Sequence, residues 1–384
     1  MIRITGDWIT NPATQSVCAA LARDGAQVFF VGGCVRNALL GAPISDIDLA
    51  TDAPPQTVSD LASAAGIKVV PTGLDHGTVT LVLDGVAHEV TTFRRDLSTD
   101  GRRATVTFSR DVAQDAARRD FTMNALYARP DGTLVDPLNG LPDLRARRVR
   151  FIGDARDRIR EDYLRSLRYF RFHAWYGDPG AGFDPGALAA IAGNLSGLQR
   201  LSRERIGSEL LKLLAAPDPA PACAAMRSTG VLGQVLPGAD DRALGLLVHL
   251  ESQAGADPEA LRRLAALGGT DVMAALRLSR SKNAWLTAVR TAATGTAGIA
   301  ELGFRLPPDQ AQDALLLRCA LAEQPWPARA AHLLEKGAQA RFPVSAQDLM
   351  PEFQGPALGA ELARLQALWI ASDFTLDRAA LLAR

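Results

Sequence analysis

The stretch of this sequence that is richest in chemistry reads VGGCVRNALLGAPISDID, residues 31–48. Its two glycines, Gly32 and Gly33, can form a turn in which backbone N–H groups approach an anion closely, because no side chains intervene. Asp46 and Asp48 are two residues apart, so on a strand both carboxylates point to the same face. Two such carboxylates repel each other unless a cation lies between them. The stretch therefore predicts a nucleoside triphosphate held beside a divalent metal.

Each half of this pattern has a simpler explanation when it is taken alone. A D-x-D pair also suits a solvated strand edge or an Asx turn, and two glycines suit any tight turn. The phosphate-binding patterns G-x-x-x-x-G-K-[ST] and G-x-G-x-x-G before a helix do not occur in this sequence. We favour nucleotide binding because a strand, a glycine pair, a short helix and a D-x-D strand follow one another within residues 31–48.

A second group of charged residues, RRDFTMNAL at 118–126, follows a basic loop expected at 94–110. Asp120 can simply cap the apolar helix expected after it. In the functional interpretation, Arg119 contacts a phosphate and Asp120 accepts a hydrogen bond from a ribose hydroxyl.

A third group lies on a helix expected at 160–172, where Arg165, Arg168 and Arg171 follow one another at intervals of three residues. Asp162 and Arg165 are neighbours on such a helix and can contact one small ligand. Arg171 lies nine residues after Asp162, half a turn away around the helix axis, so Arg168 and Arg171 must serve something beside that ligand. The alternative is an amphipathic helix whose charges lie in water.

The elements that must position these residues form a mixed α/β region over residues 1–150. Apolar runs predict its strands, and helical spacing that ends in glycine predicts its helices. The expected elements are helices at 12–23 and 54–65, a short helix closed by Gly41, strands at 27–31 and 46–50, and a hairpin at 78–83 and 86–93. Strands on either side of Asp131-Gly132 add a second hairpin, which indicates a mixed or antiparallel sheet.

From Phe151 onward, Ala, Leu and Arg recur at helical spacing between Gly and Pro clusters, and no segment favours a strand. A softer boundary falls near Pro237-Gly238. We therefore expect three parts, at residues 1–150, 151–237 and 238–384.

Composition narrows the class of protein. The 384 residues have a formal net charge of zero, which argues against a uniformly basic nucleic-acid binder, but the segment 94–171 holds 18 arginines and 12 acidic residues. The four cysteines lack C-x-x-C spacing, so we expect free thiols. With no long apolar run and no secretion signal at the start, we expect a cytoplasmic protein with no membrane contact.

Together these stretches resemble those of the class II tRNA nucleotidyltransferases, the CCA-adding enzymes and bacterial poly(A) polymerases of the polymerase-beta-like superfamily. The likeness covers residues 28–214 and includes DPLNGLPDL at 136–144 and LSRERI at 201–206. It implies an α+β fold with a mixed-sheet nucleotidyltransferase head and an all-helical neck, body and tail. Residues 1–150 would be the catalytic head, residues 151–237 would carry the nucleotide-selecting helix, and residues 238–384 would bind tRNA.

The resemblance also implies a role for each motif residue. Asp46 and Asp48 would be the catalytic ligands of two Mg²⁺ ions. The nucleotide-binding residues would be Gly32, Gly33, Arg36, Arg119, Asp120, Asp162, Arg165, Arg168 and Arg171. Glu89, on the returning strand of the first hairpin, is our candidate for a third catalytic carboxylate, and an exposed strand position explains it equally well.

Donor and acceptor patterns suggest which bases the selecting residues would accept. Cytosine and adenine both present an amino group beside a ring-nitrogen acceptor, whereas uracil and guanine present a carbonyl beside an N–H. Asp162 only accepts hydrogen bonds and Arg165 only donates them, so the pair suits C and A. We expect template-independent addition of C, C and A to the 3′ end of tRNA from CTP and ATP, with no obligate protein partner.

Two residues depart from the family pattern, since Asn37 stands where Asp is usual and Tyr163 where Pro is frequent. Three other functions stay open: a poly(A) polymerase, which shares every motif, an enzyme that adds only CC, and a catalytically inactive RNA-binding module. The mixed charge of the last helical segment, the long loop at 94–110 and the intact D-x-D pair favour CCA addition over these three. The sequence has no His-Asp dipeptide, as an appended metal phosphohydrolase domain would require.

Overall fold

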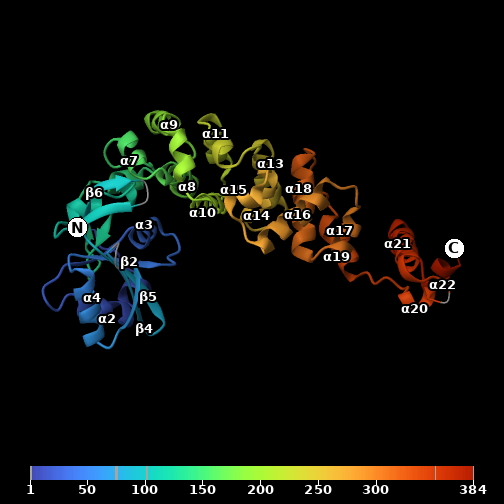
Figure 1. Ribbon diagram of the computed structural model, residues 1–384, viewed down its shortest axis with the longest axis horizontal. Coiled ribbons are helices and arrows are strands. Elements are labelled where there is room, and N and C mark those ends of the chain that lie inside the picture. The colour runs from blue at the N-terminus through green and yellow to red at the C-terminus, as the bar shows by residue number, and fades with distance from the viewer. Residues whose placement is uncertain (1, 74–76, 101–102, 351, 384) are drawn as a thin grey trace. The chain divides into compact units, whose positions relative to one another are not determined.

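The computed structural model describes residues 2–73, 77–100, 103–350 and 352–383. The chain divides into two compact units, Met1–Pro237 and Gly238–Arg384 (Figure 1). The first unit contains strands and helices, and the described residues of the second are helical apart from turns and one isolated bridge.

A mixed seven-stranded sheet forms the centre of the first unit, in the order β3-β4-β5-β2-β1-β8-β9. Its strands are β1 (Val28–Val31), β2 (Ile47–Thr51), β3 (Lys68–Gly73), β4 (Thr78–Leu83), β5 (Val86–Thr92), β8 (Tyr127–Ala128) and β9 (Leu134–Val135). Strands β2 and β5 run parallel, and every other neighbouring pair is antiparallel. The expected strands, both hairpins and the mixed sheet are thus confirmed.

Helices α1 (Asp7–Thr10), α2 (Pro12–Leu21) and α4 (Pro55–Ala64) lie beside the sheet, and α2 and α4 pack against each other and against β4 and β5. Helix α3 (Gly33–Leu40) follows β1 and ends at Gly41, whose left-handed conformation (φ +67°) closes it as expected. Phe29, Phe93 and Tyr127 are among the buried residues that form the core around the sheet.

The basic segment at 94–110, which we expected to be a loop, is instead a two-stranded antiparallel ribbon. Its strands are β6 (Arg94–Asp100) and β7 (Arg103–Phe108), and residues 101–102 lie outside the described part of the chain. The sequence of β7 contains threonines and Val106. Such β-branched residues favour strands, and their preference outweighs that of the neighbouring arginines.

Short helices complete the first unit. They are α5 (Val112–Ala117), η2 (Thr122–Asn124), α6 (Leu141–Arg145), α7 (Ala155–Glu161), α8 (Leu164–Tyr176), α9 (Pro185–Ala192), η3 (Leu195–Arg200), α10 (Arg203–Leu214), α11 (Ala220–Ser228) and α12 (Val231–Val235).

The prediction of a single helix over 160–172 is wrong, because Asp162 separates α7 from α8. Its backbone is extended (φ −149°, ψ +106°), and its carboxylate accepts a hydrogen bond from the Leu164 N–H at 3.1 Å. Such local bonding by aspartate competes with helical hydrogen bonding. The expected half turn between Asp162 and Arg171 therefore does not apply.

Aromatic rings join the head to α8 within the first unit. Phe121, just before η2, lies 4.8 Å from Phe172 of α8, measured between ring centroids. Phe151 lies 5.0 Å from Phe121 and stacks on Tyr169 of α8 at 5.5 Å. All four rings are buried, so α8 is packed firmly against the residues that follow α5.

The second unit is built from α13 (Arg242–Ala254), α14 (Ala260–Leu267), α15 (Val272–Leu276), α16 (Arg280–Thr294), α17 (Ile299–Arg305), α18 (Pro308–Leu321), α19 (Ala330–Gln339), α20 (Ala346–Leu349), α21 (Gly355–Ala371) and α22 (Arg378–Leu382). Its core contains a buried ionic cluster, in which Arg262 and Arg263 both pair with Glu251 at 2.8 Å. None of the helices in the described residues is both long and apolar enough to span a membrane. The four cysteines are free and buried, as expected.

Candidate active site

Three carboxylates line one cavity of about 890 Å³ beside the parallel pair of strands. Asp48 on β2 lies directly opposite Glu89 on β5, and Asp46 precedes β2 by one residue. All three residues contribute to the wall, as does Arg168 from α8. The structure thus places the D-x-D pair and the candidate third carboxylate around the same space.

Asp48 is the carboxylate of this cluster whose pKa is raised by its surroundings. Burial, followed by repulsion from Glu89, raises the pKa of the Asp48 carboxyl to about 6, although Arg119 opposes the shift. A bound cation would favour the ionised form of Asp48, so these oxygen donors fit a divalent metal. Within the described residues, no three acidic, histidine or cysteine side chains converge closely enough to form a ready-made metal site. Asp46, Asp48 and Glu89 are the carboxylates that line this cavity.

The glycine turn connects β1 to α3, as expected. Gly32 has φ +70°, a conformation that favours glycine, and α3 begins at the next residue. A Cβ atom at Gly32 would lie 3.6 Å from Arg119 Nη1, and one at Gly33 would lie 3.7 Å from Arg36 Nη2. Two of the expected phosphate-contacting arginines thus border the turn.

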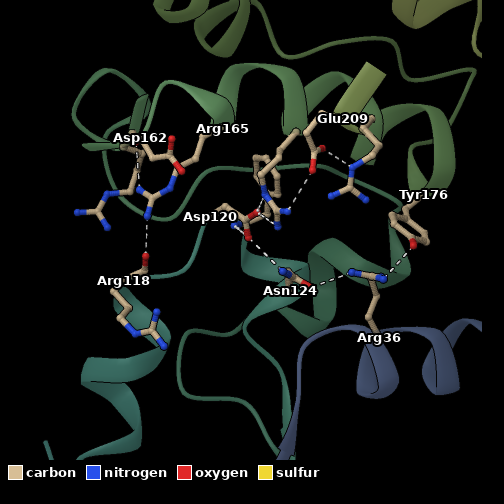
Figure 2. Close-up of polar contacts among 12 residues, drawn as sticks. Arg36, Arg118, Asp120, Asn124, Asp162, Arg165, Tyr176 and Glu209 are labelled. Carbon is tan, nitrogen blue, oxygen red and sulfur yellow. Dashed lines mark hydrogen bonds and ion pairs between the residues drawn. The ribbon is translucent and has the colours of Figure 1, made fainter. Parts of the chain in front are cut away.

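Arg36 is buried, and its hydrogen-bond partners are all neutral oxygens (Figure 2). Nη1 donates to Asn124 Oδ1 at 2.7 Å, Nη2 donates to Tyr176 Oη at 2.8 Å, and Nε donates to Asn37 Oδ1 at 3.1 Å. In the part of the chain that the structure describes, Arg36 forms no ion pair with a carboxylate. Burial lowers the pKa of this guanidinium. The amide of Asn37, where Asp is usual, leaves that positive charge in place.

Arg119 is held differently, by a buried carboxylate. Its Nη2 donates to Asp115 Oδ2 at 3.0 Å, and Tyr127 Oη donates to the same oxygen at 2.7 Å. Arg118 pairs with the other oxygen of Asp115 at 2.7 Å. Burial alone would raise the pKa of Asp115, but Arg119 and Arg118 outweigh it and bring the pKa to about 2.

Asp120 is not the cap of an apolar helix, because only the three-residue turn η2 follows it. Both of its carboxylate oxygens are engaged: Oδ1 accepts from the Phe121 N–H at 2.9 Å and from Asn124 at 3.1 Å, and Oδ2 accepts from Arg168 Nε at 2.7 Å. Burial opposes ionisation, yet Arg168 and these hydrogen bonds lower the pKa of Asp120 to about 2. Asp120 therefore links the head to α8 (Figure 2).

Asp162 and Arg165 do not contact each other through their side chains. Asp162 Oδ2 accepts from Arg205 on α10 at 2.7 Å. Arg165 donates to Glu161 Oε2 at 2.6 Å and to the Arg118 carbonyl oxygen at 2.8 Å. Different neighbours thus hold the two candidate base-reading side chains, Asp162 and Arg165, both labelled in Figure 2.

Arg168 and Arg171 share Glu209, a buried carboxylate on α10. Arg171 Nε donates to Glu209 Oε2 at 2.6 Å, and Arg168 Nη1 lies 3.9 Å from Oε1. Both guanidiniums also lie about 5 Å from the Phe172 ring centroid, at 5.2 and 4.9 Å. Glu209 thus brings one negative charge from outside the basic segment 94–171 to two of its arginines.

Sequence reasoning missed six residues of this network: Asp115, Asn124, Tyr127, Tyr176, Arg205 and Glu209. Arg205 belongs to the LSRERI segment on which part of the resemblance rests, and Glu209 follows it by one helical turn. No local pattern singles out Asn124 or Tyr176. Tyr163 fits its place because its ring occupies the space beside Gly197, where a Cβ would lie 1.9 Å from it.

We predict that Asp115→Asn lowers the free energy of unfolding of the first unit at pH 7 by about 3 kcal/mol, since it leaves two arginines without their buried partner. The folded pKa of Asp115 lies below its unfolded value, so its stabilisation is complete above about pH 4 and disappears as the pH falls towards 2. In denaturant titrations, the variant should therefore lose less stability than wild type over this interval. The exposed control Asp60→Asn should match wild type, and an unchanged acid slope in Asp115→Asn would contradict the assignment.

Comparison with known proteins places these features in a family. Residues 28–150 match the family model described as the Poly A polymerase head domain, and residues 182–242 match the one described as the probable RNA and SrmB-binding site of polymerase A. The human mitochondrial CCA tRNA nucleotidyltransferase 1 is 44% identical over 201 residues, which cover 52% of this chain and 46% of that protein. The CCA-adding enzyme of Limosilactobacillus fermentum is 41% identical over 202 residues, 52% of this chain and 49% of that protein.

In these sequence alignments the chain spans about half the length of the curated relatives that it matches. A solved structure extends the likeness. The Bacillus stearothermophilus CCA-adding enzyme in complex with CTP superposes with a TM-score of 0.78 at 30% identity, over 94% of this chain and 93% of that one. The chain therefore belongs to the family of CCA-adding enzymes, the tRNA nucleotidyltransferases.

Proposed function

We propose that this chain adds C, C and A to the 3′ end of tRNA from CTP and ATP, without a nucleic-acid template. The observation that carries the proposal is the cavity in which Asp46, Asp48 and Glu89 meet Arg168 of α8. Such a space suits a ligand that brings metal ions and phosphates together. The glycine turn and Arg36 lie in the same unit and offer further contacts for an anion.

In this proposal Asp46 and Asp48 hold two Mg²⁺ ions, with Glu89 as a third carboxylate. The raised pKa of Asp48 supports the assignment, because a carboxylate that resists ionisation gains from a bound cation. When bound, Mg²⁺ would acidify the RNA 3′-hydroxyl and stabilise the charge on the triphosphate and the departing pyrophosphate. A protein side chain acting as general base is then unnecessary.

The chain's own residues would hold the nucleotide by its two ends. Backbone N–H groups at Gly32 and Gly33, with Arg36 and Arg119, would contact the phosphates. Asp120 fixes Arg168, and a ribose contact by Asp120 would require one of its present hydrogen bonds to be exchanged.

Asp162 and Arg165 would read the base edge. An acceptor beside a donor complements cytosine and adenine and opposes uracil and guanine. Arg205 and Glu161 hold the two side chains, so they would also limit how far each can turn. Arg168 and Arg171 would support this selecting group from α8.

We assign residues 1–150 to the catalytic head, residues 151–237 to the nucleotide-selecting neck and body, and residues 238–384 to tRNA binding. The names of the relatives support tRNA as the substrate. A cytoplasmic location and the absence of an obligate protein partner stay predictions from the sequence.

Purified protein incubated with tRNA that ends at its discriminator base tests the proposal. CTP, ATP, UTP and GTP are supplied singly and together, and the new 3′ ends are sequenced. We expect C, C and A in that order. Addition of A alone would identify a poly(A) polymerase, and addition of CC alone would identify a CC-adding enzyme. The absence of any addition would favour an inactive RNA-binding module.

We predict that Asp46→Ala or Asp48→Ala abolishes nucleotide addition while leaving the fold and tRNA affinity nearly unchanged, because both carboxylates act through metal. Turnover and tRNA binding measured side by side will check this. Asp60→Ala removes an exposed carboxylate elsewhere in the head and should retain full turnover. Turnover of either site variant within about tenfold of wild type would contradict the metal assignment.

We predict that Asp162→Ala relaxes discrimination against UTP and GTP, because it removes the acceptor that opposes their carbonyl oxygens. A base contact of this kind contributes about 1–3 kcal/mol, so the ratio of kcat/KM for CTP over UTP should fall by roughly ten- to a hundredfold. Asp157→Ala, an exposed carboxylate on α7, should leave the ratio unchanged. A uniformly lower rate with an unchanged ratio would mean that Asp162 serves only to hold Arg205.

A further inference from the structure

Tyr176 is the last residue of α8 and contacts Arg36 of α3, although 140 positions separate them in the chain. Its hydroxyl oxygen accepts a hydrogen bond from Arg36 Nη2 at 2.8 Å. The guanidinium carbon of Arg36 also lies 4.0 Å from the centroid of the Tyr176 ring. Tyr176 therefore contacts the guanidinium through both its ring and its hydroxyl, as Figure 2 shows for the hydrogen bond.

The three partners of Arg36 come from different places. Asn37 is the next residue and moves with Arg36, so it cannot fix the guanidinium relative to the rest of the site. Asn124 belongs to the head, and its side chain also donates to Asp120. Tyr176 is the partner that comes from α8. The direction of the Arg36 side chain therefore depends on where this helix lies.

The chemistry of the contact matters as much as its position. A carboxylate in place of the phenol would accept the same hydrogen bond but would cancel the positive charge of Arg36. An aromatic ring and a neutral hydroxyl orient a planar guanidinium while leaving its charge available to an anion. Arg119, Arg168 and Arg171, by contrast, each pair with a carboxylate.

We propose that Tyr176 is a positioning residue that fixes Arg36 for contact with the triphosphate. The inference rests on the proposed function in one respect, namely that the anion is the triphosphate of CTP or ATP. Arg165 and Arg168 lie on the same helix as Tyr176. Helix α8 thus carries Arg165, one of the two base-reading residues, near its start and Tyr176 at its end, so one rigid element helps to align both ends of a nucleotide.

This arrangement has a specific kinetic consequence. CTP and ATP carry the same triphosphate, so loss of the Tyr176 hydroxyl should weaken both equally and leave the choice of base unchanged. Tyr176→Phe should raise KM for CTP and for ATP by about three- to tenfold, the usual net effect of one hydrogen bond, with kcat unchanged. Tyr176→Leu, which removes the ring as well, should raise both KM values further.

Tyr169→Phe is the matched control. It makes the same change on the same helix, and it also removes a hydroxyl that forms a hydrogen bond, here from the Asp184 N–H at 3.1 Å. Steady-state kinetics with tRNA and each nucleotide, together with calorimetric titration of inorganic triphosphate, are measured for wild type and all three variants. We expect Tyr169→Phe to match wild type in KM and in triphosphate affinity, even if its thermal stability falls as much as that of Tyr176→Phe.

The two claims fail in different ways. If wild type adds no nucleotide to tRNA, the proposed function fails, and the triphosphate titration alone still decides the role of Tyr176. If Tyr176→Phe has the KM values and triphosphate affinity of wild type, the inference is wrong. It is also wrong if the variant loses kcat alone, or if its preference for CTP over UTP changes, because a phosphate-positioning residue should affect neither.

Discussion

The buried charge of Arg36 is the constraint on which the rest of the site depends. Moving an ion out of water is costly unless a partner of opposite charge accompanies it. The other site arginines, Arg119, Arg165, Arg168 and Arg171, have such a partner in Asp115, Glu161, Asp120 or Glu209. Arg36 has amide and phenol oxygens instead, and burial lowers its pKa. Among the residues that the structure describes, Arg36 is thus a buried cation without a carboxylate partner where α3 meets α8, and a bound anion would complete it.

The carboxylates at and beside β2 form a concentration of negative charge, opposite in sign to the charge of Arg36. Asp48 and Glu89 lie on adjacent parallel strands, and burial and mutual repulsion raise the pKa of Asp48. In the proposed function, a metal-bound nucleoside triphosphate would supply both charges at once, a cation for the carboxylates and an anion for Arg36. The paired arginines between these two places are structural as well, since Arg168 links Asp120 of the head to Glu209 of α10. Binding and folding thus use the same side-chain network.

Local patterns in the sequence were enough to predict a mixed sheet, both hairpins and the helix that Gly41 ends, because turn residues and apolar periodicity act over a few positions. They did not predict the edge strand β3. They failed where a distant partner decides the structure. Asp162 interrupts the expected helix at 160–172, where its carboxylate accepts from Leu164 and from Arg205, 43 positions later. The segment 94–110 was expected to be a loop and forms a ribbon. The motif residues were placed by resemblance, whereas Tyr176 and Asn124, which orient Arg36, carry no local signal.

Thermal unfolding of Arg36→Met, with and without inorganic triphosphate and Mg²⁺, tests the central claim most directly. Methionine fills a similar volume against Phe172 and Tyr176 without the charge. We expect its Tm without ligand to lie within about 3 °C of wild type, a shift of roughly 1 kcal/mol, because an unpaired buried ion adds little stability. We also expect triphosphate to raise the Tm of wild type and not that of the variant. A variant that loses much more stability yet keeps the triphosphate shift would show that Arg36 is a structural residue and not the anion contact.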